Sequence, residues 1–190
     1  MPSALSVQQW QLPRGIDLSA LEEVPLPVPL RALLFRRGLT KPEQIQALLV
    51  DSPLPKPDGH FPELERAVQR LQQACKKAER VAICGDYDAD GMTSTALLLR
   101  TLRTLGAEPL AAIPSRMADG YGLNCSMVND LHDAGVRLIV TVDNGVAAHE
   151  ALSRADDLGM EVVLTDHHTL PKTRPKALAL IHPATTPEHS

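Results

Sequence analysis

The sequence predicts an α/β fold, with a parallel sheet flanked by helices on both faces and a short helical N-terminal appendage. Short apolar runs of strand length alternate with helical segments through the last two-thirds of the chain, and the connections between them are short. These runs are continuously apolar, which is typical of strands covered on both faces. Hydrophobic residues make up 44% of the 190 residues and aromatic residues only 3%, so we expect an aliphatic core.

Residues 1–60 differ from the rest, and we interpret them as a helical N-terminal appendage followed by a Pro-rich linker. Many of the 16 prolines lie in two stretches that favour extended chain, 24–29 and 51–62. Between them, Thr40 and Glu43 have the spacing of a capping box, which predicts the start of a helix. Gly38 predicts the end of the helix before it.

Residues 61–190 are expected to form one α/β domain. It opens with an amphipathic helix, because the apolar residues between 64 and 78 recur at helical spacing. The apolar runs that we expect to form strands are 81–84, 110–113, 138–142, 162–164 and 178–181. The helices expected between them span about 92–105, 124–135 and 146–158.

Composition narrows the classes of function. The formal net charge is −4, so the chain does not bind DNA by charge alone, and few aromatic side chains are available to stack on bases. The three cysteines have no CxxC spacing, which is typical of a reducing compartment. With no signal peptide and no apolar run of membrane length in the sequence, we expect a cytoplasmic protein without membrane contact.

Acidic and histidine residues follow three of the predicted strands. They are Asp86, Asp88 and Asp90 after the first strand, Asp143 after the third, and Asp166, His167 and His168 after the fourth. The carboxyl ends of parallel strands share one edge of a sheet, so we expect these side chains to meet. An aspartate after a strand is often only a turn or helix-cap residue. Three carboxylates within five positions repel one another, however, unless a cation lies among them.

The ligand set indicates the metal and the chemistry. Carboxylate oxygens with one or two imidazoles suit Mn²⁺ or Mg²⁺ better than a zinc site dominated by cysteine. Two such cations about 3.5–4 Å apart clamp a phosphoryl group and activate a water molecule. The residues therefore predict phosphoester hydrolysis at a two-metal centre.

Four segments resemble the DHH phosphoesterase superfamily and, more narrowly, the RecJ-type single-stranded-DNA exonucleases. They read GDYDADGMTSTALLL (85–99), PSRMADGYGLN (114–124), LIVTVDNGV (138–146) and VVLTDHH (162–168). The segment 33–50 is similar to the helical lead-in of the same family. The resemblance implies a DHH phosphoesterase domain over residues 61–190 that is incomplete at its C-terminus. The fourth motif and the DHHA1-type domain of the family have no counterpart before Ser190, so we expect little or no exonuclease activity from this chain alone.

The resemblance also implies a role for each site residue. The implied metal ligands are Asp86, Asp88, Asp90, Asp143 and His167. The implied catalytic residues are His168, which would face the scissile phosphate, Asp143, which would bridge the two cations, and Arg116, which would contact a substrate phosphate. Asp166 is expected to orient a histidine. Cys84 stands where many members carry a metal-binding histidine, and we interpret it as a core residue because a thiolate is a poor ligand for Mn²⁺.

The activity implied is metal-dependent phosphodiester hydrolysis, as a 5′→3′ exonuclease on single-stranded DNA in DNA repair and recombination. The partners implied are a single-stranded-DNA-binding protein and a recombination helicase. One alternative is a small-substrate DHH phosphodiesterase acting on oligonucleotides or cyclic dinucleotides, which the GYGL segment (120–123) and the lead-in disfavour. The other is a non-catalytic RecJ-like scaffold, which the intact set of ligands disfavours.

Overall fold

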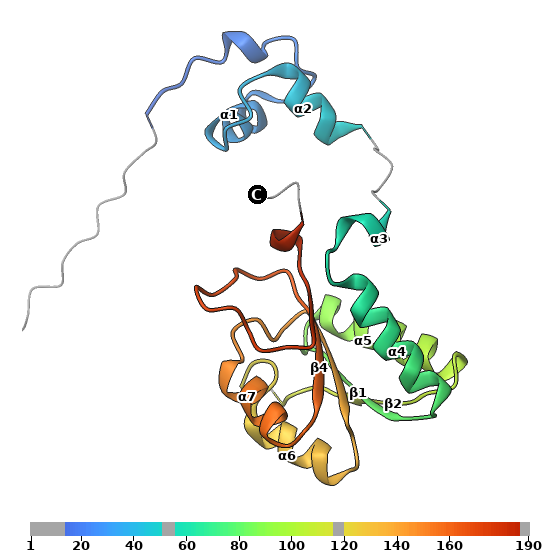
Figure 1. Cartoon of the computed structure of the whole chain (residues 1–190). Coiled ribbons are helices and arrows are strands. Elements are labelled where there is room, and N and C mark those ends of the chain that lie inside the picture. The colour runs from blue at the N-terminus through green and yellow to red at the C-terminus, as the bar shows by residue number, and fades with distance from the viewer. Residues whose placement is uncertain (1–13, 51–55, 116–119, 187–190) are drawn as a thin grey trace, which may run out of the picture. The chain divides into compact units, whose positions relative to one another are not determined.

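The chain folds into two compact units, residues 1–54 and 55–190 (Figure 1). The computed structural model describes residues 14–50, 56–115 and 120–186. No helix in these described ranges is long and apolar enough to cross a membrane.

The first unit is a small helical body. It contains a 3₁₀ turn, Ser19–Leu21, and two helices, α1 (Val28–Arg36) and α2 (Pro42–Leu49). Leu21, Val24 and Ile45 are its buried apolar side chains.

Of the two helix boundaries predicted in this unit, one is confirmed and one is wrong. Gly38 has φ +90° directly after the last turn of α1, which confirms it as the residue that ends this helix. The predicted capping box of Thr40 and Glu43 is wrong. Pro42 is the first helical residue, so Lys41 is the N-cap and Gln44, not Glu43, is the third helical residue. The Oε1 atom of Gln44 accepts the backbone N–H groups of Thr40 and Lys41, each at 3.1 Å.

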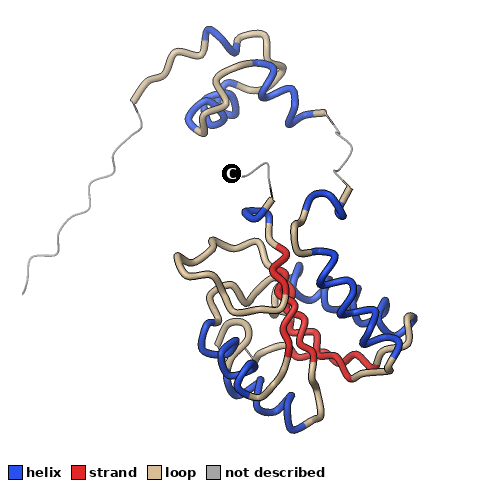
Figure 2. Tube along the Cα trace, in the orientation of Figure 1, coloured by secondary structure: helices blue, strands red, loops and turns tan. Residues whose placement is uncertain are grey.

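The second unit is built on a five-stranded parallel sheet (Figure 2). Its strands are β1 (Arg80–Cys84), β2 (Glu108–Ala112), β3 (Leu138–Val142), β4 (Glu161–Thr165) and β5 (Ala179–Ile181). The order is β2-β1-β3-β4-β5, and every neighbouring pair is parallel, which confirms the predicted sheet. Because β2 and β3 lie on opposite sides of β1, the connections diverge between β1 and β3, where open α/β sheets bind ligands.

Helices cover both faces of this sheet, as predicted. On one face, α4 (Leu64–Lys76) and α5 (Ala89–Thr104) pack against Val81, Ile83 and Val140. On the other face, α6 (Cys125–Asp133) and α7 (His149–Asp157) pack against Ala82, Cys84 and Ile139. Successive residues of one strand therefore enter opposite cores, which explains why the runs are apolar throughout.

Some helix bounds in this unit differ from the predictions, among them those around α3 and α5. The stretch predicted to be an extended linker contains a short helix, α3 (Pro57–His60), which begins at a proline, a residue suited to the first helical position. Helix α5 begins at Ala89, three residues before the predicted start, because Asp88 is its N-cap. The last described element is a 3₁₀ turn, Pro183–Thr185, after β5.

Candidate metal centre

Three loops at the carboxyl ends of β1, β3 and β4 bring together most of the acidic and histidine residues singled out in the sequence. These strands are neighbours in the sheet, so the loops that follow them are adjacent. Asp88 Oδ1 caps α5 by accepting the Gly91 N–H at 3.1 Å, and this hydrogen bond lowers the pKa of Asp88. A Cβ atom on Gly91 would lie only 2.7 Å from the backbone of Asp86, so only glycine allows this tight turn.

Asp88, Asp90 and Asp143 form the first group. Each offers a carboxylate oxygen, and these oxygens lie within 4.8 Å of one another. Asp88 and Asp90 are exposed, whereas the Asp143 side chain is only 6% exposed. Asp143 also has φ +63°, a left-handed conformation that aspartate and asparagine adopt more readily than most residues. The backbone at the end of β3 therefore turns this carboxylate toward the other two.

The two oxygens of Asp143 have different surroundings. Oδ1 lies 2.8 Å from His167 Nε2, whereas Oδ2 is buried and has no hydrogen-bond partner among the described residues. Burial raises the pKa of Asp143, and the negative charges of Asp90 and Asp88 raise it further. A carboxylate with one buried oxygen that has no donor among the described residues, grouped with two further carboxylates, fits a divalent cation.

Asp143, His167 and His168 form the second group, with one ligand atom of each again within 4.8 Å of the others. His168 Nδ1 donates to Asp166 Oδ1 at 2.7 Å, and this hydrogen bond raises the pKa of His168. His168 is therefore biased toward the imidazolium form, which carries a positive charge beside the carboxylates.

Asp166 organises this corner through its own hydrogen bonds. Its Oδ1 accepts the backbone N–H groups of His167 and His168 at 2.7 and 3.1 Å, and its Oδ2 accepts the Val146 N–H at 3.0 Å. Although burial acts to raise it, these donors hold the pKa of Asp166 below its usual range. Both oxygens are occupied by protein donors, so Asp166 is arranged to orient His168.

Tyr121 is a site residue that the sequence analysis did not assign a role. Its hydroxyl donates to the Asp143 carbonyl oxygen at 3.1 Å and lies 3.3 Å from His168 Nε2. Burial, helped by the surrounding carboxylates, raises the pKa of Tyr121 to about 12, so the hydroxyl keeps its proton. The signals in the sequence were its place in the GYGL segment and its two flanking glycines, which both have positive φ in the structure.

Asn144 was also missed, and it connects three segments. Its Nδ2 donates to the Cys84 and Val142 carbonyl oxygens, both at 2.9 Å, and its Oδ1 accepts the Leu123 N–H at 3.1 Å. The ends of β1 and β3 are thereby joined to the loop that carries Tyr121. Its place directly after Asp143 was the only available signal.

The remaining predicted residues lie in different settings. Asp86 is 1% exposed, its Oδ1 accepts the Tyr87 N–H at 2.7 Å, and it belongs to neither group. Cys84 is fully buried in the core, and burial raises its pKa to about 12, which keeps it a thiol. Arg116 lies outside the described residues.

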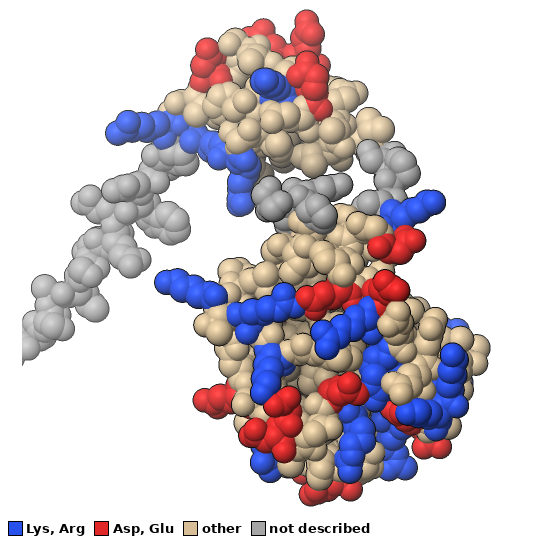
Figure 3. All heavy atoms as spheres, viewed as in Figure 1, with Lys and Arg blue, Asp and Glu red and all other residues tan. Residues whose placement is uncertain are grey.

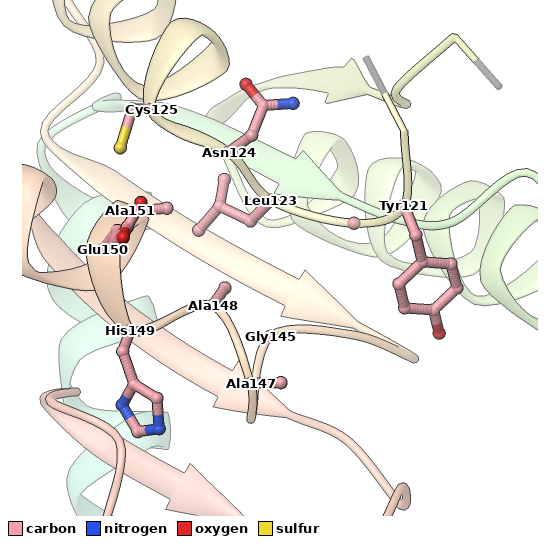
Figure 4. Close-up of a pocket in the computed structure, with 11 residues that line it drawn as sticks. Tyr121, Leu123, Asn124, Cys125, Gly145, Ala147, Ala148, His149, Glu150 and Ala151 are labelled. Carbon is pink, nitrogen blue, oxygen red and sulfur yellow. The ribbon is translucent and has the colours of Figure 1, made fainter. Parts of the chain in front are cut away.

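A cavity of about 500 Å³ lies beside this centre, between the starts of α6 and α7. Figure 4 shows Tyr121 at one end of it and Cys125 and His149 at the other. Gly145, Ala147 and Ala148 also line the cavity, so small side chains leave this space open. Tyr121 borders both the cavity and the acidic centre.

The surface charge is mixed on the visible face of the second unit. In Figure 3, Lys and Arg side chains lie among Asp and Glu side chains over this face. This agrees with the small net charge of −4. On this face, strong attraction for a polyanion is therefore expected only where a cation is bound locally.

Residues 80–190 match the DHH family, N-terminal domain. The chain belongs to the DHH family. The match includes β1 to β5 and therefore all three loops of the acidic centre.

Relatives of this DHH-family chain are exonucleases by name. The chain is 39% identical over 178 residues to the single-stranded-DNA-specific exonuclease RecJ of Escherichia coli, which covers 93% of this chain and 30% of that protein. It is 38% identical over 154 residues to the protein of the same name from Thermus thermophilus, covering 81% of this chain and 22% of that protein. The chain thus spans less than a third of the length of these two relatives.

Solved structures show the same fold. A crystal structure of exonuclease RecJ bound to manganese matches 73% of this chain and 34% of that chain, with a TM-score of 0.64 and 40% identity. RecJ from Thermus thermophilus in complex with Mn²⁺ matches 83% of this chain and 22% of that chain, with a TM-score of 0.59 and 34% identity. Both matches agree with the parallel sheet and its covering helices.

Proposed function

We propose that this chain carries the metal centre of a phosphodiester hydrolase that acts on single-stranded DNA from the 5′ end. The observation that carries the proposal is the buried Oδ2 of Asp143, which has no hydrogen-bond partner among the described residues, in a carboxylate grouped with two further carboxylates and two imidazoles. The names of the relatives, which are exonucleases specific for single-stranded DNA, support the substrate class. Solved relatives in complex with manganese support the metal.

The proposed metal ligands are Asp88, Asp90, Asp143 and His167. Asp86 is proposed to bind the metal or to support these ligands from the same turn. When Mn²⁺ or Mg²⁺ is bound, it supplies an activated water molecule and neutralises charge on the phosphate. Asp143 belongs to both groups of the centre, which supports a bridging position. Asp86 is buried in the same turn, where its contact with the Tyr87 N–H holds the loop that carries Asp88 and Asp90.

The proposed role of His168 is to stabilise negative charge on the phosphate that reacts. Asp166 favours the imidazolium form of His168 and orients its ring, so the ring can donate a hydrogen bond to a phosphate oxygen. Tyr121 limits the motion of the same ring from the Nε2 side. Arg116, four residues before Gly120 in the sequence, is proposed to contact a substrate phosphate.

The cavity beside Tyr121 is the proposed place for the end of the DNA strand. Its volume of about 500 Å³ is within the usual range for small-molecule sites, and it opens next to the acidic centre. Because the protein surface has a net charge of −4, DNA binding is proposed to depend on the bound cations rather than on a basic surface.

The wider setting belongs to the same proposal. We infer a DHH phosphoesterase domain over residues 61–190 and a helical appendage with a linker over residues 1–60. A single-stranded-DNA-binding protein and a recombination helicase are the proposed partners. The three free cysteines support a cytoplasmic location, which keeps thiols reduced.

The test is digestion of a single strand labelled at its 3′ end, on which removal of nucleotides from the 5′ end is seen as shortening, by the purified chain at low salt, with Mn²⁺, with Mg²⁺ and with excess chelator. Because the sequence leads us to expect little activity, incubation is long and the protein is in excess over DNA. We expect shortening of the single strand that requires the cation, and slower shortening of a matched duplex. Equal rates with and without chelator, or a preference for the duplex, would contradict the proposal.

A further inference from the structure

His182 lies directly after β5, and both nitrogens of its buried ring make hydrogen bonds. The residue is 3% exposed. Its Nδ1 accepts the Ala184 N–H at 3.0 Å, and its Nε2 lies 2.7 Å from the carbonyl oxygen of His168. A carbonyl oxygen only accepts, so Nε2 must carry the proton, and Nδ1 must be bare because it accepts. These two contacts select one tautomer of the ring.

The second contact reaches the turn that carries the histidines of the metal centre. Two consecutive residues at the end of β5 hold this turn at its two ends. The Ile181 carbonyl oxygen accepts the Asp166 N–H at 3.3 Å, and His182 donates to the carbonyl oxygen of His168. Inside the turn, Asp166 Oδ1 accepts the backbone N–H groups of the two histidines.

The chain that leaves this turn has no regular structure. Residues 169–177 form neither a helix nor a strand, so no ladder of backbone hydrogen bonds holds His168 from its C-terminal side. The hydrogen bond from His182 is placed where that support is absent. Without it, the carbonyl oxygen of His168 would lose this partner and the turn could rotate.

We propose that His182 is a positioning residue that fixes His168, through its backbone carbonyl, at the distance and angle at which the His168 ring meets the phosphate. This inference rests on the proposed function, because it assigns His168 its role at the phosphate. His182 belongs to neither group of candidate ligands, so we expect its effect to be on turnover rather than on metal binding.

The two ring nitrogens can be separated by substitution, because two amide side chains mimic one nitrogen each. In His182→Gln, the amide nitrogen reaches the place of Nε2 and keeps the donor to His168, but the cap on Ala184 is lost. In His182→Asn, the amide oxygen replaces Nδ1 and keeps the cap on Ala184, but the donor to His168 is lost. A positioning role and a purely structural capping role therefore predict opposite rankings.

The first measurement uses the unmodified chain without metal. Long-range ¹H–¹⁵N correlation spectra report which ring nitrogen of a histidine carries the proton. We expect His182 in the Nε2–H tautomer. The Nδ1–H tautomer would overturn the proposal, because Nε2 would then have no proton to donate.

The second measurement compares the variants by the backbone amide signals of His167 and His168 and by the kinetics of DNA hydrolysis with Mn²⁺. We expect His182→Asn to shift both amide signals and to lower kcat about tenfold, with KM unchanged. His182→Gln should keep the amide signals and retain kcat within about twofold. Gln showing the larger loss, or both variants showing equal loss, would overturn the proposal.

A matched control alters another contact of the same residue. Thr185 Oγ1 donates to the His182 backbone carbonyl oxygen at 2.7 Å, and Thr185→Val removes this bond without touching the ring. We expect no shift of the His167 and His168 amide signals in this variant, and a shift as large as that of His182→Asn would count against the proposal. If the unmodified chain shows no hydrolysis that depends on Mn²⁺, the proposed function fails, while the tautomer and the amide signals still decide the positioning role.

Discussion

The two ends of the parallel sheet differ in how their carboxylates are paired. At the amino ends of the strands, Arg70 of α4 lies between two carboxylates, with Nη2 at 2.7 Å from Glu79 and Nε at 2.5 Å from Glu161. At the carboxyl ends, Asp88, Asp90 and Asp143 gather, and one oxygen of Asp143 has no partner among the described residues. In the first arrangement a cation of the protein lies between the carboxylates, whereas in the second we propose that a cation from outside takes this place.

The pKa shifts report the same contrast. Although burial opposes it, the hydrogen bonds from Arg70 to Glu161 and Glu79 raise the pKa of this guanidinium and favour its charged form. At the other end, burial and neighbouring carboxylates raise the pKa of Asp143 and disfavour its charged form. Charge therefore stabilises the fold at the amino ends of the strands. At the carboxyl ends the negative charges destabilise the metal-free fold, as expected of a functional site.

The largest effect is expected from Asp143→Asn. Asparagine keeps the shape and tolerates φ +63°, but it removes the charge that is proposed to hold cations. We expect Mn²⁺-dependent hydrolysis to fall by about a thousandfold or more, because both cations of a two-metal site are needed. The free energy of unfolding of the metal-free chain, measured with urea, should stay equal or rise, because repulsion among carboxylates is relieved.

His168→Ala should give the next largest effect. Its ring supplies positive charge to the phosphate in the proposed mechanism, and such groups contribute about a hundredfold or more to rate. We expect kcat to fall by about that factor while the Mn²⁺ dissociation constant changes little. A loss of Mn²⁺ affinity as large as the loss of kcat would instead make His168 a metal ligand.

Arg70→Met should reverse the pattern. It leaves Glu79 and Glu161 facing each other without their shared cation, and the Arg70 side chain is only 11% exposed. We expect the free energy of unfolding to fall by about 2 kcal/mol. This is less than the loss expected when a fully buried ion pair is broken, because the Glu161 side chain is 45% exposed. Mn²⁺ affinity of the folded chain, measured well below the melting temperature, should equal that of the parent, and a large change would show that the two ends are coupled.

The smallest effect is expected at the sheet edge, from Glu63→Gln. Glu63 accepts the Leu180 N–H of β5 at 2.8 Å and pairs with Arg174. Although burial opposes it, these donors lower the pKa of Glu63, so its contribution to stability is present above the ordinary glutamate pKa and lost as pH falls through the lowered one. We expect the parent to exceed the variant by less than about 1 kcal/mol at neutral pH.

The pH dependence of that difference is the measurement. In urea unfolding between pH 7 and pH 3, the difference in the free energy of unfolding between the parent and Glu63→Gln should shrink as the pH falls through the lowered pKa of Glu63. A gap that grows toward low pH would contradict the assigned direction of the shift.

Much of the fold was predictable because strand burial and helix periodicity are local properties of sequence. The apolar runs predicted the parallel sheet, and Asn124 was correctly placed as a helix start, since its Oδ1 accepts the Met127 N–H at 3.0 Å. The start of α7 was not predictable in this way. Val146 donates its N–H to Asp166, twenty positions away, and the helix begins only at His149.

The same division applies to the site. Asp88, Asp90 and Asp143 could be grouped from sequence because each follows a strand of the same sheet. The parts played by Tyr121 and His182 depend on single hydrogen bonds to His168 from loops that are distant in the chain. No spacing rule predicts such contacts, which explains why these two residues were missed.

The central claim, that the carboxylates at the carboxyl ends of the strands exist to hold divalent cations, is tested most directly by titrating Mn²⁺ into the metal-free chain. Free Mn²⁺ is followed by electron paramagnetic resonance for the parent, Asp143→Asn and Arg70→Met. We predict saturable binding by the parent and by Arg70→Met, and loss of this binding in Asp143→Asn. Equal binding by the parent and Asp143→Asn would contradict the account.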